Sequence, residues 1–179
     1  MVSANAQEVN KHHHTKTCRK HDTSCRFGYP RFPSSYTIIV EPCKEKDQEK
    51  RKEKLTKNRL VLRKVKEVLE DEESISQIMK NHSPQDETKE EHRIKIRERI
   101  KQLCDLAGVT VGSYYIALSE SKSGYALVQR RDLNEIYINS YNPEWIRAWN
   151  GNMDIQIVLD YFAVITYVTD YYAKDDTGK

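Results

Sequence analysis

The sequence predicts an α+β fold with three parts: a small N-terminal lobe, a charged helical insert, and a C-terminal piece of strands and a helix. Three observations lead to this prediction. Residues 1–43 hold three of the four cysteines and four of the six histidines. Residues 44–106 are dominated by charged side chains, with apolar residues at helical spacing, and residues 107–179 are the richest in aromatic residues.

Composition limits the function classes. Hydrophobic residues make up 37% and charged residues 32%, so either the core is small or part of the chain is a solvated insert. The net charge of +3 is of mixed sign, which permits nucleic-acid binding without arguing for it. No apolar run approaches the roughly 18 residues that span a bilayer, and the N-terminus carries no signal sequence. We expect an intracellular, reducing compartment, where cysteines are metal ligands or buried thiols.

The first two parts contain one predicted strand and two predicted helices. Residues 36–42 (YTIIVEP) form a β-branched run that ends at proline, which indicates a strand. Residues 44–57 have almost no apolar side chains and suit a solvated helix or a disordered linker. Ser83-Pro84 separates the two helices, and Gly108 suits the end of the second. The apolar positions at helical spacing are Val61, Val65, Val68 and Leu69, then Ile96, Ile100, Leu103 and Ala107.

The C-terminal part predicts three strands and a final helix. The strands are 125–131 (YALVQRR), 135–141 (EIYINSY) and 152–158 (NMDIQIV). A helical turn opens at Pro143. Residues 160–174 suit a helix with Asp160 as its N-cap, and one face is formed by Val164, Val168 and Tyr171 or Tyr172.

The N-terminal lobe contains a candidate zinc site. Four side chains within fourteen residues supply two imidazoles and two thiolates, which suits tetrahedral zinc: His12, His14, Cys18 and Cys25. The order differs from a familiar zinc finger, because the histidines lead and the cysteines are seven apart. The turn in CRFGYP supports the loop, and His13 and His21 are substitute ligands. The alternative is an exposed polar tract with buried thiols.

A catalytic metal site is a second possible role for the same histidines. Rolling-circle nucleases place two histidines around one hydrophobic residue to hold a catalytic metal. His13 occupies the middle position here, and Lys11 and Thr15 do not flank a buried strand, which disfavours that role. Cys43 and Cys104 lack nearby histidines, so we interpret both as structural.

Two segments resemble one family. HHHTKTCRKHDTSCRFGYPRFPS is similar to the H-x-H-T-x-T-C…CRF-x-[FY]-P segment of Helitron-related proteins. Residues 130–174 resemble the same family's run of arginines, then YNP, then an N-x-x-[ID] segment, then Y-x-x-x-Y followed by lysine. Together the two segments cover about half of the chain.

The resemblance implies a rolling-circle replication initiator of a transposable element, joined to a DNA helicase in the nucleus. In that family a tyrosine hydroxyl attacks a phosphate of single-stranded DNA, becomes joined to the 5′ end and releases a 3′ hydroxyl. The matching residues here are Tyr167, Tyr171 and Lys174. Mg²⁺ or Mn²⁺ would serve only the full-length nuclease, because this chain lacks the metal-binding histidine pair and the helicase phosphate loop. We expect an internal fragment, from a truncated or decayed copy, that does not cleave DNA alone.

The tyrosine spacing fits that chemistry, although a structural alternative remains. Residues four apart share a helix face, so Tyr167 and Tyr171 would reach one active site, with Lys174 stabilising developing negative charge. The chain has eleven tyrosines, so Tyr167 could instead pack in the core. Asp170 also departs from the lysine found in many relatives.

Several cations and tryptophans are candidate contacts to single-stranded DNA, since such binders combine cations with stacking faces. These residues are Arg130, Arg131, Arg147, Trp145 and Trp149. The alternative places the tryptophans in the core and the arginines in surface ion pairs. Two further functions remain open at this point: a non-catalytic zinc-stabilised DNA- or protein-binding module, and a charged helical scaffold with an accidental motif. No membrane partner is expected.

Overall fold

The computed structural model describes residues 10–15, 18, 25, 27–80, 88–140, 142, 144–145, 148, 161–162, 164–166 and 168–169. It is an α+β fold, as predicted, and helices dominate it. The elements run in the order β1 (Ile38–Pro42), α2 (Gln48–Glu70), α3 (Glu72–Lys80), α4 (Lys89–Leu106), α5 (Val111–Ser119), β2 (Glu120–Ser121), β3 (Ala126–Val128) and the 3-10 helix η1 (Leu133–Glu135).

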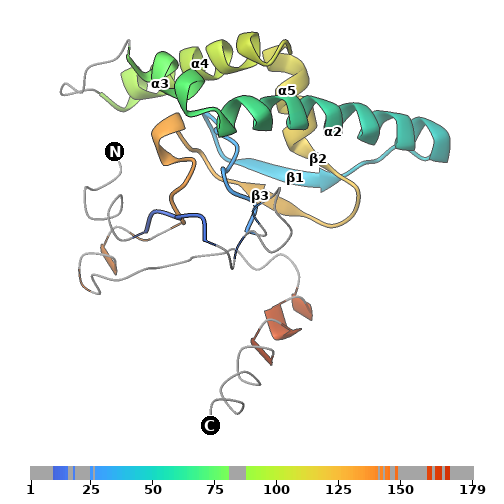
Figure 1. Cartoon of the computed structure of the whole chain (residues 1–179). Coiled ribbons are helices and arrows are strands. Elements are labelled where there is room, and N and C mark those ends of the chain that lie inside the picture. The colour runs from blue at the N-terminus through green and yellow to red at the C-terminus, as the bar shows by residue number, and fades with distance from the viewer. Residues whose placement is uncertain are drawn as a thin grey trace.

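A small sheet lies beneath a layer of helices (Figure 1). Its strand order is β2-β1-β3, with β1 parallel to β2 and antiparallel to β3. Along β1, Ile38 and Val40 are buried, whereas Ile39 is 64% exposed. This alternation places one face of the sheet against the core and leaves the other face open. The strand predicted at 36–42 is confirmed and begins two residues later.

The charged region folds into three helices, where two were predicted. Asp47 caps α2 by accepting hydrogen bonds from the backbone of Glu49 and Lys50. Asp71 interrupts the run: it follows the end of α2, and its carboxylate accepts from the backbone N–H of Ser74 to start α3. A capping box of Thr88 and Glu91 starts α4.

The helical stripes predicted from spacing face the core. Gly108 has a φ of +63° and follows the C-cap of α4, as predicted. The fully or nearly fully buried members of the two stripes are Val65, Leu69, Ile96, Ile100 and Leu103. Residues from β1, α5 and η1 join the same hydrophobic cluster, so the charged region shares one core with its neighbours on both sides.

The C-terminal region differs most from expectation. Residues 111–119 form a helix that the sequence did not predict, and the strand predicted at 125–131 is reduced to β3. The strand predicted at 135–141 is not found in its described part, residues 135–140, because η1 occupies the start and Ile138 makes an isolated bridge there. The described residues between 161 and 169 are helical, as predicted. The strand predicted at 152–158 and the N-cap Asp160 lie outside the described residues.

A buried ion pair joins the helical layer to the segment after β3. Arg99 of α4 pairs with Asp132, whose side chain is 1% exposed. The same carboxylate accepts a hydrogen bond from the backbone N–H of Leu133 and so begins η1. This pair therefore fixes the start of the segment that carries Tyr137 and Asn139.

Candidate metal centre

Four side chains near the N-terminus converge on one point. The ligand atoms of His12, His14, Cys18 and Cys25 all lie within 4.8 Å of one another, so the cluster could hold a metal ion. The Sγ atom of Cys25 lies 3.3 Å from Nε2 of His12, and Sγ of Cys18 lies 3.6 Å from Nδ1 of His14. Bonds to tetrahedral zinc of about 2.3 Å for sulfur and about 2.0–2.1 Å for nitrogen separate such ligands by about 3.6 Å. The spacing thus suits a four-coordinate ion.

Local turns hold the two cysteines. The backbone N–H of Thr15 donates to Cys18 Sγ over 3.1 Å, and the N–H of Cys18 donates back to the carbonyl of Thr15. After Cys25, the N–H of Gly28 donates to the carbonyl of Cys25 over 2.8 Å, and Gly28 adopts a φ of +75°. The predicted support from the CRFGYP turn is therefore seen. A backbone donor directed at sulfur stabilises the thiolate form that a metal requires.

One buried tyrosine, Tyr29, and one half-buried tyrosine, Tyr137, orient the imidazoles. The His12 ring stacks on Tyr29 with centroids 4.3 Å apart and an interplanar angle of 10°. The edge of His14 meets Tyr137 at 5.8 Å, and the two tyrosines are themselves stacked. The Tyr29 hydroxyl donates to the side-chain carbonyl of Asn139. These contacts restrict how either histidine ring can turn, which preorganises the ligand set.

Backbone pairing ties the metal lobe (residues 10–31) to residues 136–139. Lys11 and Ile138 form an antiparallel bridge, and the N–H of His12 donates to the carbonyl of Tyr137 over 2.7 Å. At one end Asn139 donates to the carbonyl of Asn10 over 3.1 Å. Farther along the lobe, the N–H of Arg31 donates to the carbonyl of Ile136 over 2.7 Å. The described residues of the lobe are therefore part of the folded body, and in Figure 1 the dark-blue segment lies below the sheet, away from the helices.

Lys66 of α2 joins the metal lobe to the helical layer. Its ammonium donates to the carbonyl of Gly28 over 3.0 Å and to the carbonyl of Pro30. Burial lowers the pKa of Lys66 to about 8, against the opposing charges of Glu70 and Cys25. The positive charge of Arg31 lowers that pKa further. Neither this lysine nor the stacked tyrosines were found from the sequence.

The other predicted metal ligands are placed differently or not described. His13 is exposed and does not belong to the cluster, while His21 lies outside the described residues. Cys43 and Cys104 are buried away from it, which agrees with their structural interpretation. Burial, aided by Asp105, raises the pKa of the Cys104 thiol to about 11.

The predicted DNA-contacting residues differ in their exposure to solvent. Arg131 is buried, and its guanidinium donates to the backbone carbonyls of Glu135 and Ile138, which favours a structural role. Arg130 is exposed, and Trp145 is 64% exposed. The backbone of Trp145 donates to the side chain of Asn142. The remaining predicted residues lie outside the described part of the chain: Arg147, Trp149, Tyr167, Tyr171 and Lys174.

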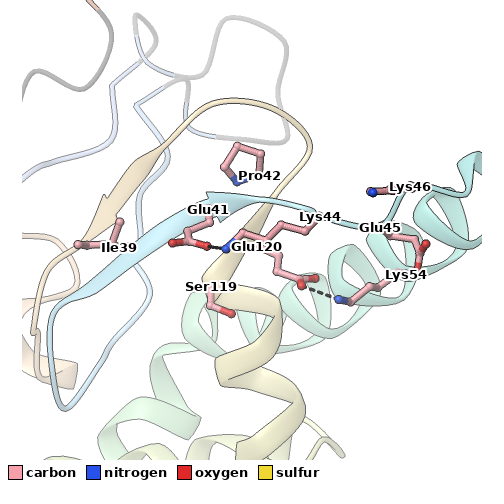
Figure 2. A pocket seen from close by; sticks show the side chains of 9 residues that line it. All are labelled: Ile39, Glu41, Pro42, Lys44, Glu45, Lys46, Lys54, Ser119 and Glu120. Atoms are coloured by element: carbon pink, nitrogen blue, oxygen red, sulfur yellow. Dashed lines mark hydrogen bonds and ion pairs between the residues drawn. The ribbon is translucent and has the colours of Figure 1, made fainter.

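A surface pocket lies beside the sheet, apart from the metal cluster (Figure 2). Its charges are largely paired with one another. Lys44 pairs with Glu41 and Lys54 pairs with Glu120, each over 2.5 Å. Because these pairs neutralise the lining, the pocket offers little net charge to a ligand.

The fold and the cluster together define an α+β protein with a two-cysteine, two-histidine site suited to a metal ion. Comparison of the chain with protein-family models, curated proteins and solved structures found no match. Among the described residues, no helix has both the length and the apolar character needed to cross a membrane.

Proposed function

We propose that this chain is a zinc-stabilised fragment of a Helitron-type rolling-circle initiator, which acts on single-stranded DNA in the nucleus. The observation that carries the metal part is the convergence of two imidazole nitrogens and two sulfurs within 4.8 Å. That donor set favours zinc over the oxygen-seeking ions magnesium and calcium. Four protein ligands leave no open position, so the zinc is structural rather than catalytic.

The packing of the two family-like segments supports the rest of the proposal. The His/Cys segment and residues 136–139 are far apart in the chain, yet they pair through their backbones and share the tyrosine stack. Two motifs that belong to one ancestral domain are expected to meet in this way. The nucleophile roles of Tyr167 and Tyr171, and the charge-stabilising role of Lys174, rest on the resemblance alone.

The isolated chain is proposed to be inactive as a nuclease. His12 and His14 are engaged with the two thiols, so they are not available to hold a catalytic divalent metal. A second candidate function, a non-catalytic zinc-stabilised DNA- or protein-binding module, is favoured by the same filled ligand set. The two candidates differ in whether a tyrosine ever becomes joined to DNA.

Metal analysis tests the zinc centre. The purified chain is expected to contain about one zinc ion, and Cys18→Ser or Cys25→Ser should lose it. Cys43→Ser is the matched control, because it makes the same change at a buried cysteine outside the cluster. Zinc retained by the Cys18→Ser/Cys25→Ser double variant would contradict the site.

Incubation with single-stranded DNA and Mn²⁺ tests the chemistry. The proposal expects no nicking by the chain alone. A 5′-phosphotyrosine adduct that disappears in the Tyr167→Phe/Tyr171→Phe variant would reject inactivity and establish the nuclease ancestry. Zinc and DNA binding without any adduct, even when the missing parts of the protein are supplied, would favour the binding module.

A further inference from the structure

Positive charge is concentrated in the metal lobe. Residues 10–31 contain six Lys and Arg residues and a single Asp, an excess of five positive charges. The whole chain has a net charge of +3, so everything outside this segment sums to −2. A metal bound by two thiolates and two neutral histidines would add no net charge. Residues 10–31 are therefore the basic part of an otherwise slightly acidic sequence, which is the charge distribution expected of a polyanion-binding protein.

Arg31 is one of two described cations of this lobe, with Lys11, and neither pairs with a described carboxylate. The guanidinium carbon of Arg31 lies 4.7 Å from the centre of the Tyr29 ring. By contrast, the neighbouring cations Lys66 and Arg131 are offset by Glu70 and Glu135. Arg31 also lowers the pKa of both neighbours, after the larger effect of their burial. An oriented, unpaired guanidinium suits a phosphate oxygen.

An exposed aromatic ring flanks the same turn. Phe27 is 47% exposed, and its ring meets the edge of the ligand His12 at 5.7 Å. The Arg31 side chain reaches the same turn, because its Nη1 atom lies only 3.6 Å from the position that a Cβ atom on Gly28 would occupy. The ring that a base could stack on and the cation that its phosphate could meet therefore lie together. Proteins that bind single strands without sequence preference use this combination.

We infer that the metal lobe binds single-stranded nucleic acid, with Arg31 on a backbone phosphate and Phe27 stacked on a base. This inference deepens the proposed function, on which it rests, by naming the surface that meets the strand. Zinc holds the turn, and the turn presents both side chains. Loss of the metal therefore loosens the nucleic-acid surface as well.

Fluorescence anisotropy with a labelled 20-nucleotide oligothymidylate tests the inference on the zinc-loaded full chain. Arg31→Gln should weaken binding about tenfold and reduce the slope of log K against log salt by about 0.7, the value for one phosphate contact. Phe27→Leu keeps an apolar side chain and should weaken binding at least about fivefold, with the salt slope unchanged. Lys57→Gln is the control, since it removes an exposed cation from α2 and should leave affinity within about twofold.

Zinc content and thermal unfolding verify that each variant is folded. The inference is overturned if Arg31→Gln and Phe27→Leu bind as tightly as wild type, or if Lys57→Gln weakens binding as much as they do. Vesicles containing anionic phospholipid that compete as well as the oligonucleotide would also overturn it. Zinc-loaded protein that fails to bind the strand rejects this surface alone. Zinc-free protein that still binds through Arg31 and Phe27 rejects the metal proposal instead.

Discussion

Lys66 on α2 donates a hydrogen bond to the backbone carbonyl of Gly28 across 3.0 Å, which connects a long helix to the turn that follows Cys25, a candidate metal ligand. The same ammonium also reaches the carbonyl of Pro30. The turn bearing Cys25 is thereby held from outside the metal lobe. A charged side chain of the helical layer therefore supports the candidate metal centre.

Replacing Lys66 should weaken metal binding. Lys66→Met keeps the length of the apolar stem but leaves two carbonyls of the turn without their donor. Because outer supports of a metal site typically contribute 10- to 100-fold in affinity, we expect a loss of about tenfold, measured by competition with a zinc chelator. Lys64→Met, at an exposed position of the same helix, should bind zinc as wild type does. Equal affinities in the two variants would exclude a supporting role.

The lowered pKa of Lys66 predicts a pH dependence of stability. Its pKa is about 8 in the fold and 10.5 in the unfolded chain, so unfolding takes up a proton between these values. The free energy of unfolding should therefore rise from pH 8 toward pH 10.5. Below pH 8 the group is protonated in both states and contributes no slope. The difference between wild type and Lys66→Met in urea unfolding isolates this contribution.

Changing a charge next to Lys66 tests whether the pH dependence comes from that residue. Glu70 and Cys25 raise the pKa of Lys66, and Arg31 lowers it. In the zinc-loaded protein Cys25 is expected to stay metal-bound, so Glu70→Gln is the informative change. It should move the onset of the rise to lower pH. If the difference in the free energy of unfolding between wild type and Lys66→Met stayed constant from pH 7 to pH 10, the lowered pKa of Lys66 would be contradicted.

The four cysteines should divide into two reactivity classes. Burial raises the pKa of Cys104 to about 11, and Cys43 is also buried, so neither should react quickly at pH 8. In the zinc-loaded protein Cys18 and Cys25 are protected as well. Chelation should release two fast-reacting thiols, counted with an aromatic disulfide reagent. Four fast thiols after chelation would mean that the core opens with the metal centre.

The buried pair of Arg99 and Asp132 should be costly to break. Asp132→Ala leaves the Arg99 guanidinium buried without its counter-ion, so we expect a loss of about 3–5 kcal/mol in the free energy of unfolding. Asp105→Ala removes an exposed ion pair with Lys101 and should cost about 0–1 kcal/mol. Urea unfolding measures both. A combined Arg99→Met and Asp132→Leu change should recover much of the loss, because it buries no unpaired charge.

The His/Cys cluster and the main helices could be predicted because both are encoded locally. The four ligands lie within a single short stretch, so no long-range contact is needed to bring them together. The stripe of Val65 and Leu69 and the Gly108 terminus of α4 follow from helical periodicity and backbone geometry. The break at Asp71 was missed, since an aspartate within a charged run is not distinctive until its carboxylate is seen capping α3.

The remaining features depend on contacts between distant residues. Helix α5 contains β-branched and aromatic residues that suit a strand by propensity, but burial of Tyr114 and Leu118 against the core favours the helix. Ile136 and Ile138 alternate like strand residues and are both buried, yet among the described residues their segment forms an isolated bridge and separate hydrogen bonds with the metal lobe instead of a strand. No sequence pattern reveals that Tyr137 stacks near the ligands or that Lys66 reaches the turn.

The long sequence separation between Tyr29 and its hydrogen-bond partner Asn139 means that the two sides of this contact are made at different times during protein synthesis. These two residues are 110 positions apart, so a ribosome adding about 5–20 residues per second needs roughly 5–20 seconds to pass from one to the other. During that interval the histidines, the cysteines and Tyr29 are already made, but Tyr137, which packs against His14, is not. Synthesis of the segment around Asn139 then completes the contacts of the candidate site, so we expect tight metal binding only late in synthesis.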